Sequence, residues 1–167
     1  MDCILFRHGI AVEPEQWDGE EAKRPLTKKG LRRLREAVAG LAALNAVPTH
    51  IVSSSYVRAR KTAELLRDTL APETDIKEYS ELHPDGKPEK VLALLATFPA
   101  DACVLCVGHE PNLGAVAGVM LCVKPVATLS LKKAGACLVR FEGAPKPGQG
   151  ELRWWMMPSQ VRAFRKT

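Results

Sequence analysis

Residues 3–9 read Cys3-Ile4-Leu5-Phe6-Arg7-His8-Gly9, and this stretch decides the fold. Its first four residues are apolar and predict a buried strand. The glycine permits a sharp turn that brings the backbone close to a ligand. An arginine and a histidine therefore stand at the carboxyl end of a strand, where ligands bind in open α/β sheets. The pair suits a phosphate, because a guanidinium binds its oxygens while an imidazole attacks phosphorus.

Two further polar clusters follow predicted strands in the same way. Ser53–Thr62 runs from the strand Thr49–Ser53 into the start of a helix. Gly108–Asn112 does the same after the strand Ala102–Val107. The start of a helix offers unpaired backbone N–H groups and partial positive charge, so both places favour an anion. If the three strands lie side by side, two histidines and at least two arginines meet in one pocket.

Strands and helices alternate along the chain until two final strands form an antiparallel pair. Thr27 is the expected N-cap of a first helix. After it, apolar residues recur at helical spacing, at Leu31, Leu34, Val38 and Leu41. Further helices are expected at Val57–Leu70, Lys87–Phe98 and from Pro111 to Cys122, and further strands at Asp75–Tyr79, Ala136–Phe141 and Glu151–Met157. The order predicts a three-layer α/β/α fold whose mostly parallel central sheet has an antiparallel edge strand.

The composition is that of a globular protein. A length of 167 residues with 46% apolar residues predicts one domain, residues 1–167. No apolar run approaches the ~20 residues that cross a bilayer, and no signal peptide is evident. We therefore expect a cytoplasmic protein with neither a membrane nor a nucleic-acid partner, and the oligomeric state stays open. The net charge of +5 favours acidic partners such as phosphates or acidic protein surfaces, although a generally basic solvated surface explains it too.

The five cysteines fit reduced thiols rather than a disulfide framework. Cys103 and Cys106 form a C-x-x-C pattern, which invites a metal or redox interpretation. In a strand, residues three apart point to opposite faces, so these two thiols would not meet around one ion. No second C-x-x-C completes a tetrahedral site, and no acidic cluster offers a magnesium site. We expect buried apolar cysteines, no metal and no cofactor.

Three motifs together resemble the histidine phosphatase superfamily, which has the phosphoglycerate mutase-like fold. Arg7-His8-Gly9 is similar to its signature tripeptide, Arg58–Ala63 to its second-arginine motif and Gly108-His109 to its second histidine. Within the superfamily the chain resembles the small phosphohistidine phosphatases of the SixA type. That resemblance rests on Arg24–Gly30 and on Gly108–Leu113.

The resemblance implies a role for each matching residue. His8 would attack phosphorus and become transiently phosphorylated, and water would then hydrolyse the phosphohistidine. Arg7 and Arg58 would bind phosphate oxygens, and His109 would donate a hydrogen bond or positive charge to the same group. The spacing of the residues does not show whether Arg58 or Arg60 binds phosphate. Only the match to the family motif selects Arg58. No metal is implied, because the cationic side chains replace it.

The general acid is the least defined part of the resemblance. Larger relatives use a carboxylic acid to protonate the leaving oxygen, and Glu81, which follows the third strand, is the candidate here. A phosphohistidine substrate needs less help from an acid, because its P–N bond is labile. The neighbouring His83 is expected to be a loop residue near a turn.

We therefore expect a metal-independent phosphatase that acts through a phosphohistidine intermediate on His8. The expected substrate is phosphohistidine on another protein, in a phosphorelay. One alternative is a small-molecule phosphomonoesterase on the same scaffold. Another is a regulatory module that binds phosphate in this pocket without turning it over.

Overall fold

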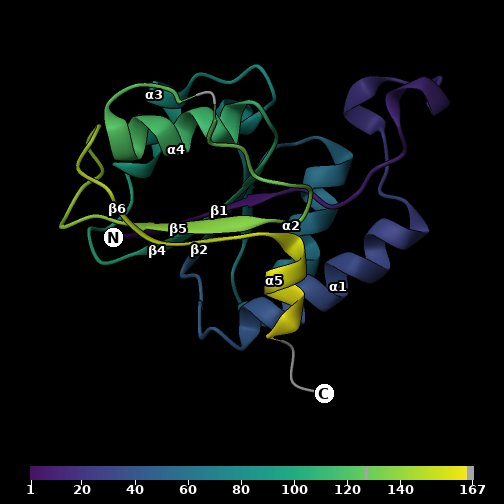
Figure 1. Cartoon of the computed structure of the whole chain (residues 1–167), viewed down its shortest axis with the longest axis horizontal. Helices are drawn as coiled ribbons and strands as arrows, with labels where there is room; N and C mark the ends of the chain where they lie inside the picture. The colour runs from purple at the N-terminus through teal and green to yellow at the C-terminus, as the bar shows by residue number, and fades with distance from the viewer. Residues whose placement is uncertain (127, 165–167) are drawn as a thin grey trace.

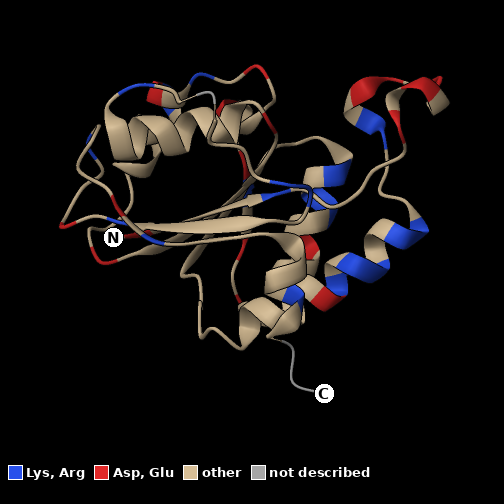
Figure 2. Ribbon diagram, viewed as in Figure 1, with Lys and Arg blue, Asp and Glu red and all other residues tan. Residues whose placement is uncertain are grey.

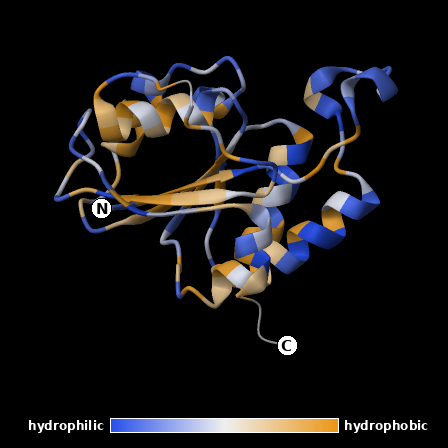
Figure 3. Ribbon diagram, viewed as in Figure 1, coloured by the Kyte–Doolittle hydropathy of each residue, from blue (hydrophilic) through white to orange (hydrophobic). Residues whose placement is uncertain are grey.

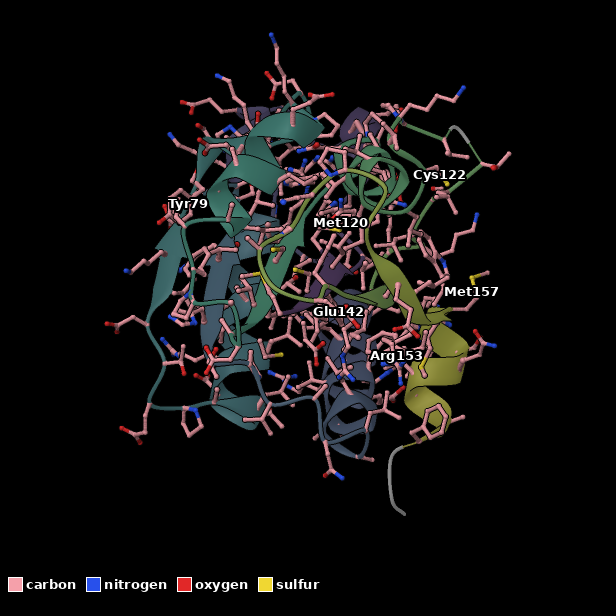
Figure 4. The ribbon with its side chains drawn as sticks, turned by 90° about the vertical axis from the view of Figure 1, so that its left-hand side faces the viewer. Tyr79, Met120, Cys122, Glu142, Arg153 and Met157 are labelled. Atoms are coloured by element: carbon pink, nitrogen blue, oxygen red, sulfur yellow. The ribbon has the colours of Figure 1, made fainter. Side chains whose placement is uncertain are left out.

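A central sheet organises the chain (Figure 1). The computed structural model describes residues 1–126 and 128–164. Within these residues six strands form the sheet: β1 (Asp2–Arg7), β2 (His50–Ser53), β3 (Ile76–Glu78), β4 (Cys103–Gly108), β5 (Ala136–Arg140) and β6 (Glu151–Met156). Their order across the sheet is β3-β2-β4-β1-β5-β6. In Figure 4, Tyr79, just after β3, and Met157, just after β6, mark its two sides.

The strand directions confirm the predicted sheet. β1 pairs with β4, β4 with β2 and β2 with β3, all in parallel. β5 is antiparallel both to β1 and to β6. The four parallel strands therefore end at one edge of the sheet, and the antiparallel β5 begins there.

Helices cover both faces of the sheet (Figure 1). One face carries α1 (Lys28–Ala42), α2 (Val57–Leu70) and α5 (Pro158–Ala163), and the other carries α3 (Pro88–Leu95) and α4 (Asn112–Cys122). Ile4 and Phe6 of β1 pack toward the first group of helices, whereas Cys3 and Leu5 pack toward the second. A strand that is buried on both faces must be apolar throughout, which explains the continuous apolar run that opens the chain (Figure 3).

The first long helix begins where the sequence predicts. The hydroxyl oxygen of Thr27 accepts a hydrogen bond from the backbone N–H of Gly30 at 2.9 Å, which confirms the N-cap. Leu34, Val38 and Leu41 lie on the buried side of α1. A Cβ atom at position 30 would lie 2.0 Å from the carbonyl oxygen of Ile10. Glycine therefore lets the start of α1 lie directly against the segment that follows His8.

Some short elements differ from the expectation. The segment between β1 and α1, for which no element was predicted, contains two 3₁₀ helices, η1 (Pro14–Gln16) and η2 (Glu21–Lys23), which project from the body of the molecule (Figure 1). A third, η3 (Ser80–Leu82), follows β3, and α3 ends at Leu95 rather than Phe98. The six-residue α5 was not expected either. Single helical turns are too short to show a periodic apolar pattern, so the sequence carries little signal for them.

The C-x-x-C residues lie on opposite faces, as predicted. Cys106 is fully buried on the α3–α4 face, whereas Cys103 is partly buried and packs on the face covered by α1, α2 and α5. In the part of the chain that the structure describes, no helix has both the length and the apolar character needed to cross a membrane.

Candidate active site

Three neighbouring strand ends bring the predicted polar clusters together. Arg7 pairs with Gly108 across β1 and β4, and Ser53 pairs with Val107 across β2 and β4. Beyond these pairs, His8 N donates to the Gly108 oxygen at 3.1 Å, and Ser54 N donates to the Val107 oxygen at 2.9 Å. The residues after each strand therefore stay in register. The side chains of His8, Ser54 and His109 share one edge of the sheet.

His8 is held in a single tautomer. Its Nδ1 lies 2.7 Å from the carbonyl oxygen of Gly9, and its Nε2 lies 3.3 Å from Nε of Arg58. A carbonyl only accepts and a guanidinium only donates, so Nδ1 carries the proton and Nε2 presents a lone pair. Burial, together with the nearby cations Arg58 and Arg7, lowers the pKa of His8 to about 3. His8 is thus neutral near pH 7, the state that a nitrogen nucleophile requires.

His109 lies beside His8 with a free ring nitrogen. The two ring centroids are 4.8 Å apart, and Nε2 of His109 lies 2.9 Å from the hydroxyl oxygen of Ser54. Its Nδ1 is buried and has no hydrogen-bond partner among the described residues. Burial holds the pKa of His109 well below its usual range, and His8 and Arg58 add to this. A buried ring nitrogen without a partner is suited to a hydrogen bond with a bound group.

Arg58 joins His8 to the segment that follows β1. This side chain is 3% exposed and lies in the first turn of α2. Besides its contact with His8, it donates from Nη1 to the carbonyl oxygen of Glu21 at 3.0 Å and from Nη2 to the Glu21 carboxylate at 2.9 Å. Arg60, in contrast, is one-third exposed and pairs with Glu64 and Glu78. The structure therefore separates the two arginines that spacing could not.

Arg7 supplies a second cation to the same edge. Its Nη1 donates to the carbonyl oxygen of Leu131 at 2.7 Å, and its Nε is buried without a partner among the described residues. The carboxylate of Glu110 accepts from the backbone N–H of Leu131 at 2.8 Å and acts electrostatically on Arg7. The guanidinium is thus held from one side and keeps N–H capacity for an anion on the other.

The segment after β1 is tied to α2 through Thr62. Its hydroxyl oxygen accepts from Gly9 N at 3.1 Å and donates to the Arg58 carbonyl oxygen at 2.7 Å. The side chain is fully buried. One hydroxyl therefore fixes the turn that carries His8 relative to the helix that carries Arg58.

The chain is similar to a known protein family and to several known proteins. The family model of the histidine phosphatase superfamily (branch 1) matches residues 3–83, which include the first histidine and both arginines of the site. An uncharacterised protein of Picosynechococcus is 36% identical over 147 residues, 86% of this chain and 87% of that protein. The phosphohistidine phosphatase SixA of Escherichia coli is 26% identical over 164 residues, 97% of each chain.

The chain belongs to the histidine phosphatase superfamily.

Solved structures confirm the phosphoglycerate mutase-like fold of this histidine phosphatase. The structure of the protein histidine phosphatase SixA with tungstate superposes with a TM-score of 0.83 at 24% identity, over 96% of this chain and 99% of that one. A phosphoserine phosphatase from Entamoeba histolytica superposes with a TM-score of 0.70 at 15% identity, over 96% and 98%. At these identities the similarity establishes the fold alone.

The histidine phosphatase site also contains Glu21, which sequence reasoning missed. Its carboxylate bridges two arginines, because Arg24 donates to it at 2.7 and 2.8 Å and Arg58 at 2.9 Å. The hydrogen bonds from Arg24, together with the charge of Arg58, hold the pKa of Glu21 below its usual range. The only sequence signal was an acid three residues before Arg24, in a loop rich in acids.

The fifth predicted residue, Glu81, lies at the rim of the site. Its carboxylate contacts only the hydroxyl of Ser80, at 3.5 Å, within the described residues, whereas its backbone oxygen accepts from the side-chain amide of Asn112 at 2.7 Å. Glu81 and His83 line a cavity of about 250 Å³. The His83 ring lies 4.8 Å from that of Tyr56, which in turn lies 5.1 Å from that of His109. The structure thus brings His8, His109 and the arginines together, without the Glu81 carboxylate.

The assembled groups are suited to metal-free phosphoryl transfer. Within the described residues, no three His, Cys, Asp or Glu side chains are arranged to hold a metal ion. Two guanidinium groups and a neutral imidazole with a lone pair converge instead. Such a site can bind the oxygens of a phosphoryl group and attack its phosphorus.

Proposed function

We propose that this histidine phosphatase removes the phosphoryl group from phosphohistidine on another protein, through a phosphorylated His8. The observation that carries the proposal is the orientation of the His8 ring. Its Nδ1 is bonded to the Gly9 oxygen and its Nε2 faces the Arg58 guanidinium at 3.3 Å. A lone pair directed at a phosphate-binding cation is the arrangement that attack on phosphorus needs.

The reaction has two steps. First, Nε2 of His8 forms a bond to phosphorus while the P–N bond to the substrate imidazole breaks, and the departing nitrogen takes up a proton from water. Arg7 and Arg58 donate to the phosphoryl oxygens, and His109 donates to the same group. Second, a water oxygen attacks phosphorus, the bond to His8 breaks and inorganic phosphate leaves. Fixed positive charge stabilises both transition states.

The choice of phosphohistidine rests on how the Glu21 and Glu81 carboxyl groups are placed. Glu21 is held ionised by its arginines, and the Glu81 carboxylate touches neither histidine among the described contacts. Neither of these two carboxyl groups is therefore placed to give a proton to a leaving group at His8. A labile P–N bond tolerates this better than an alkyl ester does. Similarity to the Escherichia coli phosphohistidine phosphatase over 97% of both chains supports the same choice.

A substrate comparison tests the specificity. We expect kcat/KM for a protein phosphorylated on histidine to exceed that for 3-phosphoglycerate and sugar phosphates. If the protein hydrolyses a small phosphate ester efficiently but does not hydrolyse the phosphoprotein, the proposal is wrong. The protein would then be a small-molecule phosphatase.

Rapid-quench trapping tests the intermediate. The wild-type protein should carry acid-labile phosphate during turnover, and His8→Gln should abolish both the trapped phosphate and the turnover without lowering the unfolding midpoint. His50→Gln is the matched control, because His50 lies at the start of β2, at the opposite end of the sheet. Tight phosphate binding with no trapped phosphate in the wild type would instead support the regulatory module.

A further inference from the structure

A basic cavity lies next to the proposed active site. It has a volume of about 210 Å³, and its wall includes Arg33 of α1, Lys132 and Lys133 of the segment before β5, and Arg162 of α5. Ile10 and Met157 contribute apolar surface, and no acidic side chain among the described residues lines it. The cavity is thus formed by residues from four separate parts of the chain.

The strand register places this cavity at the same edge of the sheet as His8. Ala136, the first residue of β5, pairs with Phe6 and with Met156, the last residue of β6. The residues before β5 and after β6 therefore flank the end of β1. The backbone N–H of Ala134, which also lines the cavity, donates to the His8 oxygen at 3.1 Å. A residue of the cavity wall is therefore bonded directly to the backbone of the proposed nucleophile.

Two of the four cations in the cavity have no charged partner in the part of the chain that the structure describes. Lys133 binds Glu13 at 3.2 Å and Arg162 binds Glu36 at 3.7 Å. Arg33 and Lys132 form no ion pair or side-chain hydrogen bond with any residue in the described parts of the chain. Figure 2 shows further Lys and Arg along the exposed side of α1. This flank of the site is therefore positive and has unused capacity to bind an anion.

The opposite flank differs in charge. The cavity that holds Glu81 also contains Asp85, together with Lys87 and Lys90. Acidic and basic side chains are mixed there, whereas the charged side chains that the structure describes in the cavity beside β5 and β6 are all basic. A large substrate seated over His8 would thus meet two flanks of different charge, and complementary charges across an interface fix orientation.

We propose that the basic cavity is a docking site for aspartate or glutamate side chains that neighbour the phosphohistidine on the protein substrate. The inference rests on the proposed function, since it requires a phosphorylated protein. The cavity is smaller than the ~300–1,000 Å³ usual for small-molecule sites, which suits one or two inserted side chains. A partner whose phosphohistidine reaches His8 must also cover the adjoining surface, and unpaired cations there favour carboxylates.

Charge reversal at the two unpaired cations tests the proposal. The Arg33→Glu/Lys132→Glu variant should lose about tenfold or more in kcat/KM for a phosphoprotein with acidic residues around its phosphohistidine. It should keep kcat/KM within about twofold for free phosphohistidine, which has the same reacting group without a protein surface. For the wild type, the phosphoprotein reaction should also slow with added salt more than the reaction of free phosphohistidine.

The matched control is Lys124→Glu/Lys146→Glu, which changes the net charge equally. Both lysines are exposed and follow α4 and β5 respectively, at the end of the molecule away from His8. This variant should turn over both substrates like the wild type. Equal losses in the two double variants, equal losses for both substrates, or no loss for the phosphoprotein would each overturn the docking site. A wild type that hydrolyses free phosphohistidine or small esters but no phosphoprotein would remove the proposed function itself.

Discussion

Arg58 uses all three guanidinium nitrogens, on His8, the Glu21 backbone oxygen and the Glu21 carboxylate. Lysine has one compact ammonium and cannot reproduce this planar fork. We expect Arg58→Lys to lower kcat/KM by about 10- to 100-fold, the value of one or two charge-assisted hydrogen bonds. Steady-state kinetics check this. Arg60→Lys, two residues along the same helix, is the control and should stay near wild type. Similar kinetics for both variants would show that Arg58 does not bind the substrate phosphate.

Glu21 places a negative charge next to the proposed phosphate site. Glu21→Gln keeps the shape of the side chain and the backbone contact to Arg58 but removes that charge. At a few ångströms in partly solvated surroundings this repulsion amounts to about 1 kcal/mol, so inorganic phosphate should bind a few-fold more tightly. The change in phosphate affinity is measured by the inhibition constants for phosphate of the wild type and the variant at low ionic strength. Weaker phosphate binding would show instead that the carboxylate acts mainly by orienting Arg58.

At the level of elements, Thr62 of α2 joins the turn after β1 to the helix. Thr62→Val removes the hydroxyl and leaves Gly9 N buried without an acceptor, so the free energy of unfolding should fall by about 1–3 kcal/mol. Thr69→Val is the control, because Thr69 lies on the exposed side of the same helix and its hydroxyl donates to the Leu65 oxygen. Urea denaturation of both variants measures the difference. Equal, small losses of unfolding free energy in the two variants would mean that the hydrogen bond from Gly9 N to Thr62 contributes little to stability.

The elements also differ in how well the sequence predicts them. α1 combines a cap, Thr27, with several turns of apolar periodicity, so its start and its buried side are both predictable. η2 has three residues and no buried side chain, yet it positions Glu21 against Arg58. A single turn has no pattern of its own. It forms there because its side chains find partners on a distant helix.

At the scale of the whole molecule, two buried neutral histidines link stability to pH. An unfolded histidine takes up a proton near pH 6.5, whereas His8 has a pKa of about 3 and His109 a pKa lowered by burial. The unfolded chain therefore binds more protons below about pH 6.5, and acidification destabilises the fold. Each histidine should contribute a loss of about 1.4 kcal/mol per pH unit below that point.

Urea denaturation between about pH 7 and pH 5 measures this loss, because most carboxylates titrate below that window. His8→Gln should have a shallower dependence than the wild type. A wild-type unfolding free energy that does not change over this window would mean that the histidines are protonated in the folded protein.

The sequence by itself determined the sheet and the order of the three polar clusters along it. A continuous apolar strand such as Cys3–Phe6 must be covered on both faces, and the clusters all follow strands that run in parallel. The motif match already selected Arg58, and only the packed structure adds the contacts that place it beside His8, brings Glu21 to it and leaves the Glu81 carboxylate without a described contact to either histidine. The physical reason is the distance along the sequence between the residues that interact. Strand and helix patterns arise from neighbours a few residues apart, whereas Arg58 meets partners 37 and 50 residues away, which only the packed fold brings into contact.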